Sequence, residues 1–215
     1  MRTILPVPVI ERLCKLFTLV SKLNSEGKTS VSSAELEKIT GIQAHSIRKD
    51  LSMLGPVVSG KGGYSTGSLE TLIESTFGFE KKRKVCVAGL DMAGLEMLKN
   101  PDSSFSGFEI SAGFDSNINR MEMLSTKVPL FHFYEIEEKI RILEIDFAIL
   151  AVPPENAHKI AARLISGGIK GILNFSPVIL APKQNVIIRN IYLAEELRLL
   201  SALLSVKEAA GVQNS

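Results

Sequence analysis

The sequence has few of the residues that mark several protein classes. Its 215 residues contain only two cysteines, Cys14 and Cys86, too few for a disulfide framework. Both lie among apolar neighbours, so we expect buried thiols rather than a redox pair. No apolar run reaches the ~18 residues of a membrane span, and the first residues lack the apolar core and cleavage site of a signal peptide. These absences favour a cytoplasmic protein without a membrane span.

Patterns of metal and catalytic sites are also missing. His45, His132 and His158 are scattered, and no His-x-x-x-His or Cys-x-x-Cys spacing predicts a metal site. No Gly-x-Ser-x-Gly nucleophile elbow occurs. A dehydrogenase needs an acid or base beside the nicotinamide; His158 is the only helix candidate near a strand end, and a surface histidine is the simpler interpretation. The sequence therefore predicts no metal site and no catalytic site, and we expect a protein that is not an enzyme.

Charge is distributed unevenly along the chain. Residues 1–84 carry 13 Lys and Arg against 8 Asp and Glu, a net charge of +5. Residues 85–215 carry 12 against 15, a net charge of −3. A basic first part favours contact with a polyanion there. Charge alone does not identify nucleic-acid binding, and a chance excess is the alternative.

The first part of the chain predicts a helix-turn-helix. Apolar residues at helical spacing predict a helix over about 9–25. Ser32 and Glu35 fit a capping box at the start of a second helix, and Gly41 fits its end. After a short turn, helical spacing resumes over 44–54. Two short helices joined by such a turn form a helix-turn-helix, whose second helix enters the major groove of DNA.

The second helix of this motif would present polar side chains that can contact DNA bases or phosphates. These side chains belong to His45, Ser46, Arg48, Lys49 and Ser52. The glycine-rich segment 55–64 then predicts a hairpin that carries Lys61, which is typical of the wing of a winged helix. An all-helical dimerisation module with solvated Arg48 and Lys49 is the alternative.

A further helix is predicted over 68–79, and a run of four cations follows it over 81–84. Such a run is typical of a solvated linker, although it could also reach DNA. We therefore place a domain boundary near residue 80. Residues 1–80 would form a DNA-binding domain, and residues 81–215 a nucleotide-binding and dimerisation domain.

A glycine turn begins the second part. The segment KVCVAGLDMAG, 84–94, predicts a buried strand, a tight turn and a helix N-terminus, which is how an α/β sheet holds a dinucleotide pyrophosphate. Gly89 and Gly94 match the outer glycines of Gly-x-Gly-x-x-Gly, but Asp91 replaces the central one. A carboxylate ~4 Å from the pyrophosphate would cost ~4 kcal/mol at an effective dielectric of ~20, about three decades of affinity, unless it turns outward. The candidate contacts of the turn are Gly89, Leu90, Asp91, Met92, Ala93 and Gly94.

Strands and helices alternate after this turn, which predicts a parallel sheet with helices on both faces. The expected strands cover 107–115, 128–130, 146–153, 171–177 and 185–191, and the expected helices 136–143 and 156–166. Asp115 lies 21 residues after Gly94. An acid at about this distance binds a ribose hydroxyl and favours NAD over NADP. An aspartate that caps a turn at the strand end is the alternative.

The last predicted helix, about 193–210, is more apolar than a single surface helix requires. Its apolar face includes Leu197, Leu199, Leu200, Leu203 and Leu204. We expect this face to pack against a partner subunit. Packing within its own chain is the alternative.

Motifs along nearly the whole chain resemble the redox-sensing transcriptional repressor family Rex. They are SSAEL at 32–36, IRKDLS at 47–52, FD at 114–115, AVP at 151–153, GIKGILNFSP at 168–177 and IYLAEEL at 191–197. The resemblance implies a homodimer with an N-terminal winged helix, a Rossmann-like domain and a last helix exchanged between subunits. It also implies binding to operator DNA that ends when NADH replaces NAD. The implied NAD(H) contacts are the glycine turn, Asp115, Val152 and Pro153.

The chain departs from the family at positions that the resemblance assigns to the ligand-dependent switch. Thr18, Asn100 and Tyr192 stand where relatives have an Arg, a Tyr and an Asp, and Asp91 replaces a glycine. We therefore expect weaker NADH binding and a weaker redox response than in typical relatives. A redox-insensitive partner of a true sensor and a small nucleotide-binding enzyme are the alternatives.

Overall fold

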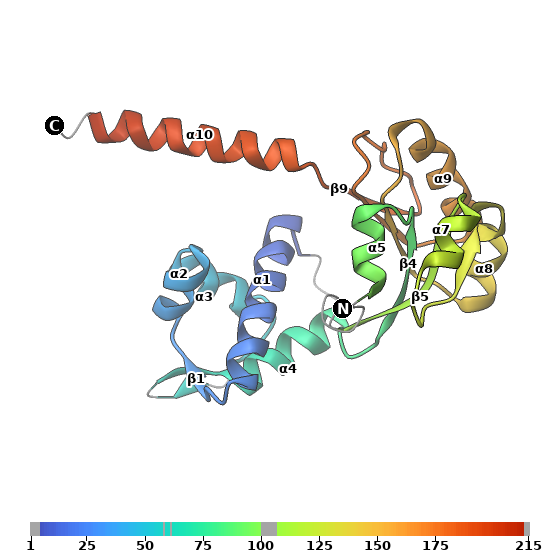
Figure 1. Cartoon of the computed structure of the whole chain (residues 1–215). Helices are drawn as coiled ribbons and strands as arrows, with labels where there is room; N and C mark the ends of the chain where they lie inside the picture. Colours follow the sequence, from blue (N-terminus) through green and yellow to red (C-terminus); the bar gives the residue numbers. More distant parts are fainter. Residues whose placement is uncertain (1–4, 58, 61, 100–106, 213–215) are drawn as a thin grey trace. The chain divides into compact units, whose positions relative to one another are not determined.

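The structure is a computed structural model that describes residues 5–57, 59–60, 62–99 and 107–212 (Figure 1). The chain separates into two compact units, Met1–Lys81 and Lys82–Ser215. The first combines helices with a small antiparallel sheet, and the second is a Rossmann-like parallel sheet with helices. The predicted mixed α/β class is confirmed. Among the helices described, none is both long and apolar enough to span a bilayer.

The first unit is a winged helix. Its helices are α1 (Val7–Ser25), α2 (Ser33–Thr40), α3 (Ala44–Ser52) and α4 (Thr66–Phe77). Its strands are β1 (Ser30–Val31), β2 (Ser59–Gly60) and β3 (Gly63–Ser65), paired antiparallel in the order β1-β3-β2. The helices and the hairpin agree with the sequence prediction. β1 was not predicted, because two residues are too short to show a periodicity.

Local signals explain where the helices of this unit begin and end. Ser32 Oγ accepts from the Glu35 backbone N–H at 3.1 Å, and the Glu35 carboxylate accepts from the Ser32 N–H at 2.8 Å, so the capping box is complete. Gly41, with φ 72°, ends α2 in the left-handed conformation. The spaced apolar residues of the helices meet in one core, which includes Leu13, Leu16, Leu36, Ile47 and Leu51.

A buried ion pair joins α1 to α3. Arg12 Nε donates to Asp50 Oδ2 at 2.6 Å, and Arg12 Nη2 donates to Asp50 Oδ1 at 2.8 Å. The Asp50 side chain is 2 % exposed and that of Arg12 32 %. Hydrogen bonding to this carboxylate raises the pKa of Arg12, so the guanidinium stays charged. The two-point contact fixes the orientation of α3 on α1.

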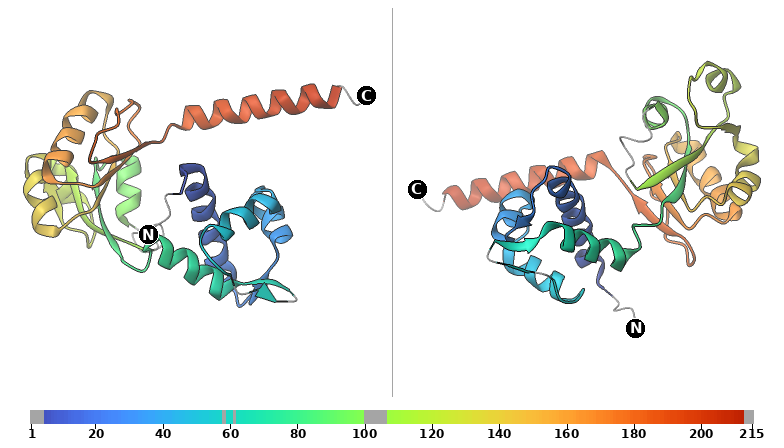
Figure 2. Two further views of the ribbon diagram at one scale, coloured as in Figure 1. Left: turned by 180° about the vertical axis from the view of Figure 1, so that it is seen from behind. Right: turned by 90° about the horizontal axis from the view of Figure 1, so that it is seen from below.

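The second unit is a six-stranded parallel sheet in the order β6-β5-β4-β7-β8-β9. The strands are β4 (Arg83–Ala88), β5 (Phe108–Asp115), β6 (Leu130–His132), β7 (Phe147–Leu150), β8 (Gly171–Asn174) and β9 (Ile187–Asn190). Helices α8 (Ile136–Leu143) and α9 (Pro154–Gly167) cover one face, and α5 (Met92–Lys99) packs on the other (Figure 2). The 3-10 helix η1 (Phe133–Glu135) precedes α8, and α7 (Ile118–Met123) follows β5.

Two details of this unit correct the sequence predictions. The expected linker over 81–84 is wrong in its second half, because β4 already includes Arg83, which pairs with Asp146 at 3.4 Å. The third strand begins at Leu130 rather than Val128, since Pro129 has no N–H for the ladder. The helix α7 was not predicted, because six residues are too few to show a clear helical period.

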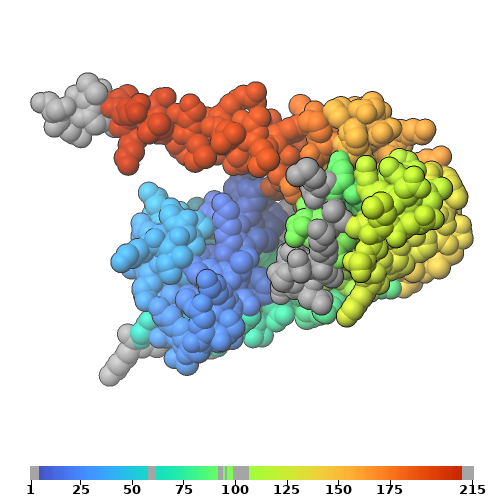
Figure 3. Space-filling model, in the orientation of Figure 1, coloured from blue at the N-terminus to red at the C-terminus, as the bar shows by residue number. Residues whose placement is uncertain are grey.

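The last helix, α10 (Leu193–Val212), follows β9, and its described side chains from 193 to 209 are all exposed (Figure 3). Leu197, Leu200 and Leu204 are 66 %, 62 % and 56 % exposed. The alternative of packing within its own chain is therefore not observed for these residues. An apolar face of this length is unusual on the surface of a monomer.

Candidate nucleotide and nucleic-acid sites

The glycine turn lies where the sheet changes direction. After β4 the chain adds β5 and β6 on one side of it, and then β7, β8 and β9 on the other side. The order of the strands therefore reverses between β4 and β7. In open α/β sheets, ligands bind at the carboxyl ends of strands at such a point. A Cβ on Gly89, with φ 98°, would lie 2.1 Å from Ala151 O, and a Cβ on Gly94 would lie 1.8 Å from Gly89 O. Gly89 is therefore required for the turn to pack against the loop after β7, and Gly94 is required for the turn to close on itself.

Asp91 is exposed at the glycine turn. Leu90 is fully buried beneath the turn, whereas the Asp91 side chain is exposed. Met92 and Ala93 lie in the first turn of α5. An exposed carboxylate is screened by water, so the repulsion of a pyrophosphate is smaller than for an inward carboxylate.

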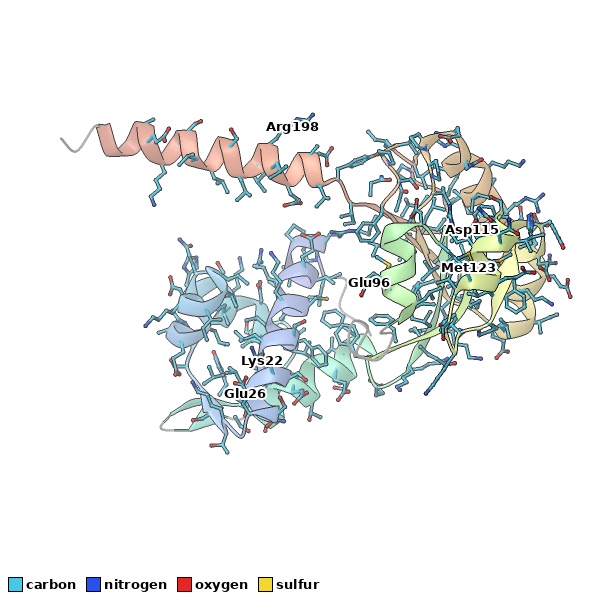
Figure 4. All side chains as sticks on the ribbon, viewed as in Figure 1. Lys22, Glu26, Glu96, Asp115, Met123 and Arg198 are labelled. Atoms are coloured by element: carbon cyan, nitrogen blue, oxygen red, sulfur yellow. The ribbon has the colours of Figure 1, made fainter. Side chains whose placement is uncertain are left out.

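Asp115, labelled in Figure 4, lies at the end of β5, and its carboxylate accepts the hydrogen bonds beside the turn. Asp115 is 3 % exposed. Oδ2 accepts from the Leu90 backbone N–H at 2.8 Å and from Arg120 Nη1 at 3.0 Å, and Oδ1 accepts from the Asn117 N–H at 2.7 Å. Asp115 thus holds the glycine turn and caps the turn after β5. Arg120 was not predicted as a site residue; a cation five positions after the strand-end acid was the available signal.

The loop between β7 and α9 forms the other wall of the turn. Val152 is buried and its backbone N–H donates to Ser176 Oγ at 3.1 Å, while Pro153 is exposed at the start of α9. This hydrogen bond takes the chain out of the strand pairing, so β7 ends at Leu150, earlier than expected. Ser176 was not a predicted site residue, although it lies within the family motif GIKGILNFSP at 168–177.

A pocket of about 300 Å³ adjoins the carboxyl ends of β5 and β6. Its lining residues are Ser116, His132, Phe133, Tyr134, Asn156, Lys159, Ile160 and Arg163. His132 is the register partner of Asp115 across β5 and β6, so the pocket begins directly beside that carboxylate. None of the lining side chains is acidic. His158, an early candidate for chemistry, is exposed and does not line the pocket.

The α3 face places most of the expected DNA contacts on the surface. His45, Arg48, Lys49 and Ser52 are exposed, and Ser46 is half-buried. Between them along the helix, Ile47 and Leu51 are buried. Lys61 of the wing lies outside the described residues.

Hydrogen bonds hold part of this face in place. Arg48 Nη1 donates to Ser33 Oγ at 2.9 Å, and Ser52 Oγ donates to Lys49 O at 2.7 Å. Arg48 therefore links α3 to the first turn of α2. Lys49 is exposed, and among the described residues no hydrogen bond or ion pair of its ammonium is seen.

Two of the switch positions are described. Thr18 is exposed on α1 and donates through Oγ1 to Cys14 O at 3.2 Å. Tyr192 is half-buried between β9 and α10; its hydroxyl oxygen is buried and, within the described ranges, has no hydrogen-bond partner. Burial raises the pKa of Tyr192, so the phenol is neutral at physiological pH. Asn100 lies outside the described residues. In the part of the chain that the structure covers, no cluster of three or more His, Cys, Asp or Glu side chains could hold a metal ion.

Together these features define a winged-helix protein joined to a Rossmann-like sheet of the nucleotide-binding type. Residues 4–52 match the model "Putative DNA-binding protein N-terminus", and residues 80–178 match the model "CoA binding domain". The redox-sensing transcriptional repressor Rex of Lactobacillus gasseri is 31 % identical, over 91 % of this chain and 92 % of that protein. Rex of Bacteroides fragilis is 29 % identical over 96 % and 94 %. The chain therefore belongs to the Rex family.

Solved structures of a relative agree with this assignment over both units. The Rex-family repressor RSP, in complex with NAD⁺ and operator DNA, has a TM-score of 0.83 at 29 % identity, over 99 % of this chain and 98 % of that one. RSP with NADH has a TM-score of 0.82 at 30 % identity, over 97 % and 98 %. The family resemblance inferred from the sequence motifs is confirmed.

Proposed function

We propose that this chain is a cytoplasmic, homodimeric transcriptional repressor that binds operator DNA through residues 1–80 and NAD(H) through residues 81–215, and that it is not an enzyme. The observation that carries the proposal is the exposed polar face of α3 on a packed winged helix, in the same chain as the glycine turn at the switch point of the sheet. The RSP complex, which contains both NAD⁺ and operator DNA, supports the proposal that one chain binds both ligands.

The α3 face reads the operator. Arg48 and Lys49 supply guanidinium and ammonium donors for guanine edges or phosphates, and His45, Ser46 and Ser52 add shorter polar contacts. Lys61 would contact the DNA backbone from the wing. Replacing Arg48 and Lys49 with Ala should abolish operator binding in a gel shift at physiological salt, because each lost contact weakens binding by about 1–3 kcal/mol.

A matched control separates this effect from a loss of general charge. Lys38 is also exposed, but it lies at the end of α2 rather than on α3. Lys38→Ala should leave operator affinity within about twofold of the unchanged protein. Binding that survives the loss of both Arg48 and Lys49 would contradict the proposed DNA interface.

The glycine turn holds the pyrophosphate of NAD(H). Gly89 and Gly94 let the backbone of the turn pack closely, because a Cβ at either position would collide with Ala151 O or Gly89 O. The N-terminus of α5, which follows the turn, favours an anion. Contacts would come from 89–94, Asp115, Val152 and Pro153. When bound, the nicotinamide would supply the redox difference between NADH and NAD⁺.

Asp91 weakens this binding. Isothermal titration with NADH should give a dissociation constant above about 1 μM, because the Asp91 carboxylate repels the pyrophosphate. Since Asp91 is exposed and screened, Asp91→Gly should tighten binding by clearly less than the roughly three decades expected for an inward carboxylate. A sub-micromolar constant for the unchanged chain would show that Asp91 does not act on the nucleotide. Thr18 and Tyr192 lack the charges expected at the switch, so NADH should change operator affinity only weakly in the same gel shift.

A second copy of the chain covers α10. On the sheet, a groove of about 380 Å³ is lined almost wholly by apolar side chains, including Phe108, Phe147, Ile149, Leu173 and Ile187. The exposed leucines of α10 match this groove in chemistry, and exchange of α10 between two subunits would cover both surfaces at once.

Light scattering tests the dimer. Leu200 and Leu204 lie one turn apart on the helix, and replacing both with Asp should convert a dimer to a monomer. Lys207→Asp on the same helix is the control and should stay dimeric. A monomeric unchanged protein would refute the proposed assembly.

A redox-insensitive partner of a true Rex sensor is the second candidate. Tyr192, whose buried hydroxyl replaces the expected carboxylate, favours it. Mixing the chain with such a sensor and finding subunit exchange by native mass spectrometry, with no response of the homodimer to NADH, would support this candidate.

A further inference from the structure

The pocket beside Asp115 has the charge and shape of a site for a phosphorylated nucleoside. Lys159 and Arg163 lie one turn apart on α9 and both line it. Ser116 and His132 add polar side chains from the ends of β5 and β6. His132 Nδ1 accepts from the Tyr134 N–H at 3.3 Å, so a neutral His132 carries its hydrogen on Nε2, as a second donor. All the charged groups on the walls are cationic.

Neither Lys159 nor Arg163 has a close ion-pair partner among the described residues. Within the described ranges, Arg163 pairs with one carboxylate, that of Glu137, at 4.0 Å, a long and half-exposed contact. Lys159 is exposed, and no ion pair or hydrogen bond of its ammonium is seen among the described residues. Two cations that face one cavity repel each other, and an anion in that cavity removes the repulsion.

The aromatic side of the pocket suits a purine. Tyr134 is 69 % exposed and stacks on His132, with ring centroids 4.4 Å apart. Phe133 also lines the cavity. A flat, partly exposed ring beside cationic groups is the usual surroundings of a base with a nearby phosphate.

Asp115 does not oppose a phosphate here. An acid at this position normally selects an unmodified ribose, because it accepts from the 2′-hydroxyl and repels a 2′-phosphate. In this chain Asp115 is 3 % exposed, and its two oxygens already accept from Leu90, Asn117 and Arg120. The Arg120 guanidinium, 3.0 Å away, also neutralises the carboxylate. The Asp115 carboxylate, which would reject a phosphate, is therefore paired, and the cations Lys159 and Arg163 of the pocket attract a phosphate.

We infer that this pocket binds an adenosine whose ribose carries a phosphate monoester, with Lys159 and Arg163 as the phosphate ligands. This inference rests on the proposed nucleotide binding and refines its specificity. The 2′-phosphate of NADP(H) and the 3′-phosphate of coenzyme A share this chemistry. Lys159 and Arg163 then act as specificity-determining residues rather than general contacts of the cofactor.

Three isomeric adenosine nucleotides test the inference: 5′-ADP, adenosine 2′,5′-bisphosphate and adenosine 3′,5′-bisphosphate. They have the same atoms. The two bisphosphates differ only in the position of the second phosphate, and each carries about one more negative charge near pH 7 than 5′-ADP, so the comparison with Lys159 and Arg163 variants is needed to locate the effect. In isothermal titration of the full chain at fixed ionic strength, at least one bisphosphate should bind about tenfold more tightly than 5′-ADP. A preference for the 2′ isomer identifies NADP(H) as the source, and a preference for the 3′ isomer identifies coenzyme A.

Substitutions then locate the effect. Lys159→Met should remove most of the preference while changing the affinity for 5′-ADP less than twofold, and Arg163→Gln should do the same. Lys183→Met is the control, because Lys183 is an exposed cation outside the pocket. Thermal unfolding of each variant checks that the fold is retained.

Two results would overturn the inference. One is equal affinity for the three isomers, which leaves the proposed NAD(H) binding intact. The other is a preference that survives both pocket substitutions. If none of the isomers binds and NADH does not bind either, the nucleotide part of the proposed function fails together with this inference, whereas operator binding is measured independently.

Discussion

The ion pair between Arg12 and Asp50 leads to a sharp prediction about what holds the DNA-reading helix in place. Arg12→Met keeps the length of the side chain but removes both hydrogen bonds to Asp50. The carboxylate, 2 % exposed, is then buried without a partner. Breaking a buried pair in this way costs about 3–5 kcal/mol. Because 32 % of the Arg12 side chain is exposed, water can partly replace it, and we expect the lower end, about 3 kcal/mol.

Urea unfolding of the full chain, followed by circular dichroism, measures this loss. With a slope of about 2 kcal/mol/M, a loss of about 3 kcal/mol lowers the unfolding midpoint by about 1.5 M. The gel shift should also show weaker operator binding, because α3 loses its two-point attachment to α1. Adding Asp50→Leu to Arg12→Met should restore most of the stability, since the buried charge disappears with its partner.

The control is an exposed pair in the same unit. Lys28→Met removes a 2.8 Å contact to Glu35, but these side chains are 39 % and 47 % exposed, so the midpoint should move much less than for Arg12→Met. If Arg12→Met shifts the midpoint no more than Lys28→Met, or if the double variant is no more stable than Arg12→Met alone, burial of Asp50 is not the source of the effect.

Three further predictions follow from other groups. Hydrogen bonds from Lys28 and from the Ser32 backbone lower the pKa of Glu35 from 4.5 to about 2. Its stabilising effect is therefore complete above about pH 4.5 and lost as the pH falls through about 2, so Glu35→Gln should be less stable than the unchanged chain at pH 6, and the difference should shrink steadily between pH 4.5 and pH 2. Gly94→Ala places a methyl group 1.8 Å from Gly89 O and should lower both thermal stability, by about 1–3 kcal/mol, and NADH affinity; Gly67→Ala, with no atom closer than 3.9 Å, should do neither. Burial raises the pKa of the Cys86 thiol to about 12, so iodoacetamide at pH 8 should leave Cys86 unmodified in the folded protein and label it in urea, as read by peptide mass spectrometry.

The elements that the sequence predicted well are those whose signals are local. The helix expected over 136–143 has those bounds, because its apolar residues repeat regularly between polar neighbours. The capping box of α2 was likewise visible in Ser32 and Glu35, three positions apart. Capping and amphipathic spacing act within one or two turns, so they can be read before any tertiary contact is known.

The elements that the sequence did not predict depend on distant partners. β1 exists because Ser30 and Val31 pair with β3, more than thirty residues later in the chain. The start of β6 depends on which residues face β5 after Pro129. Neither pairing leaves a local pattern, since two or three residues are too few to show a period of two.

The candidate site divides in the same way. Gly89, Gly94 and Asp115 were found because strand, turn and acid occur at characteristic spacing. The cationic pocket was not found, because its walls come from the ends of two strands and from one face of α9. Only the parallel register of β5 and β6 brings His132 beside Asp115. The partners of Asp115 were equally hidden, since a carboxylate in a sequence does not show whether a ligand or its own backbone will use it.

The place of α10 in the chain has a consequence for how the protein is made. Every strand of the sheet precedes α10, so a ribosome releases the apolar groove before it has synthesised the helix that we propose to cover the partner's groove. A nascent chain therefore exposes an apolar groove that it cannot bury by itself. Subunits translated side by side on one messenger RNA would meet sooner than subunits released separately, and slow translation of the final segment would favour aggregation over assembly.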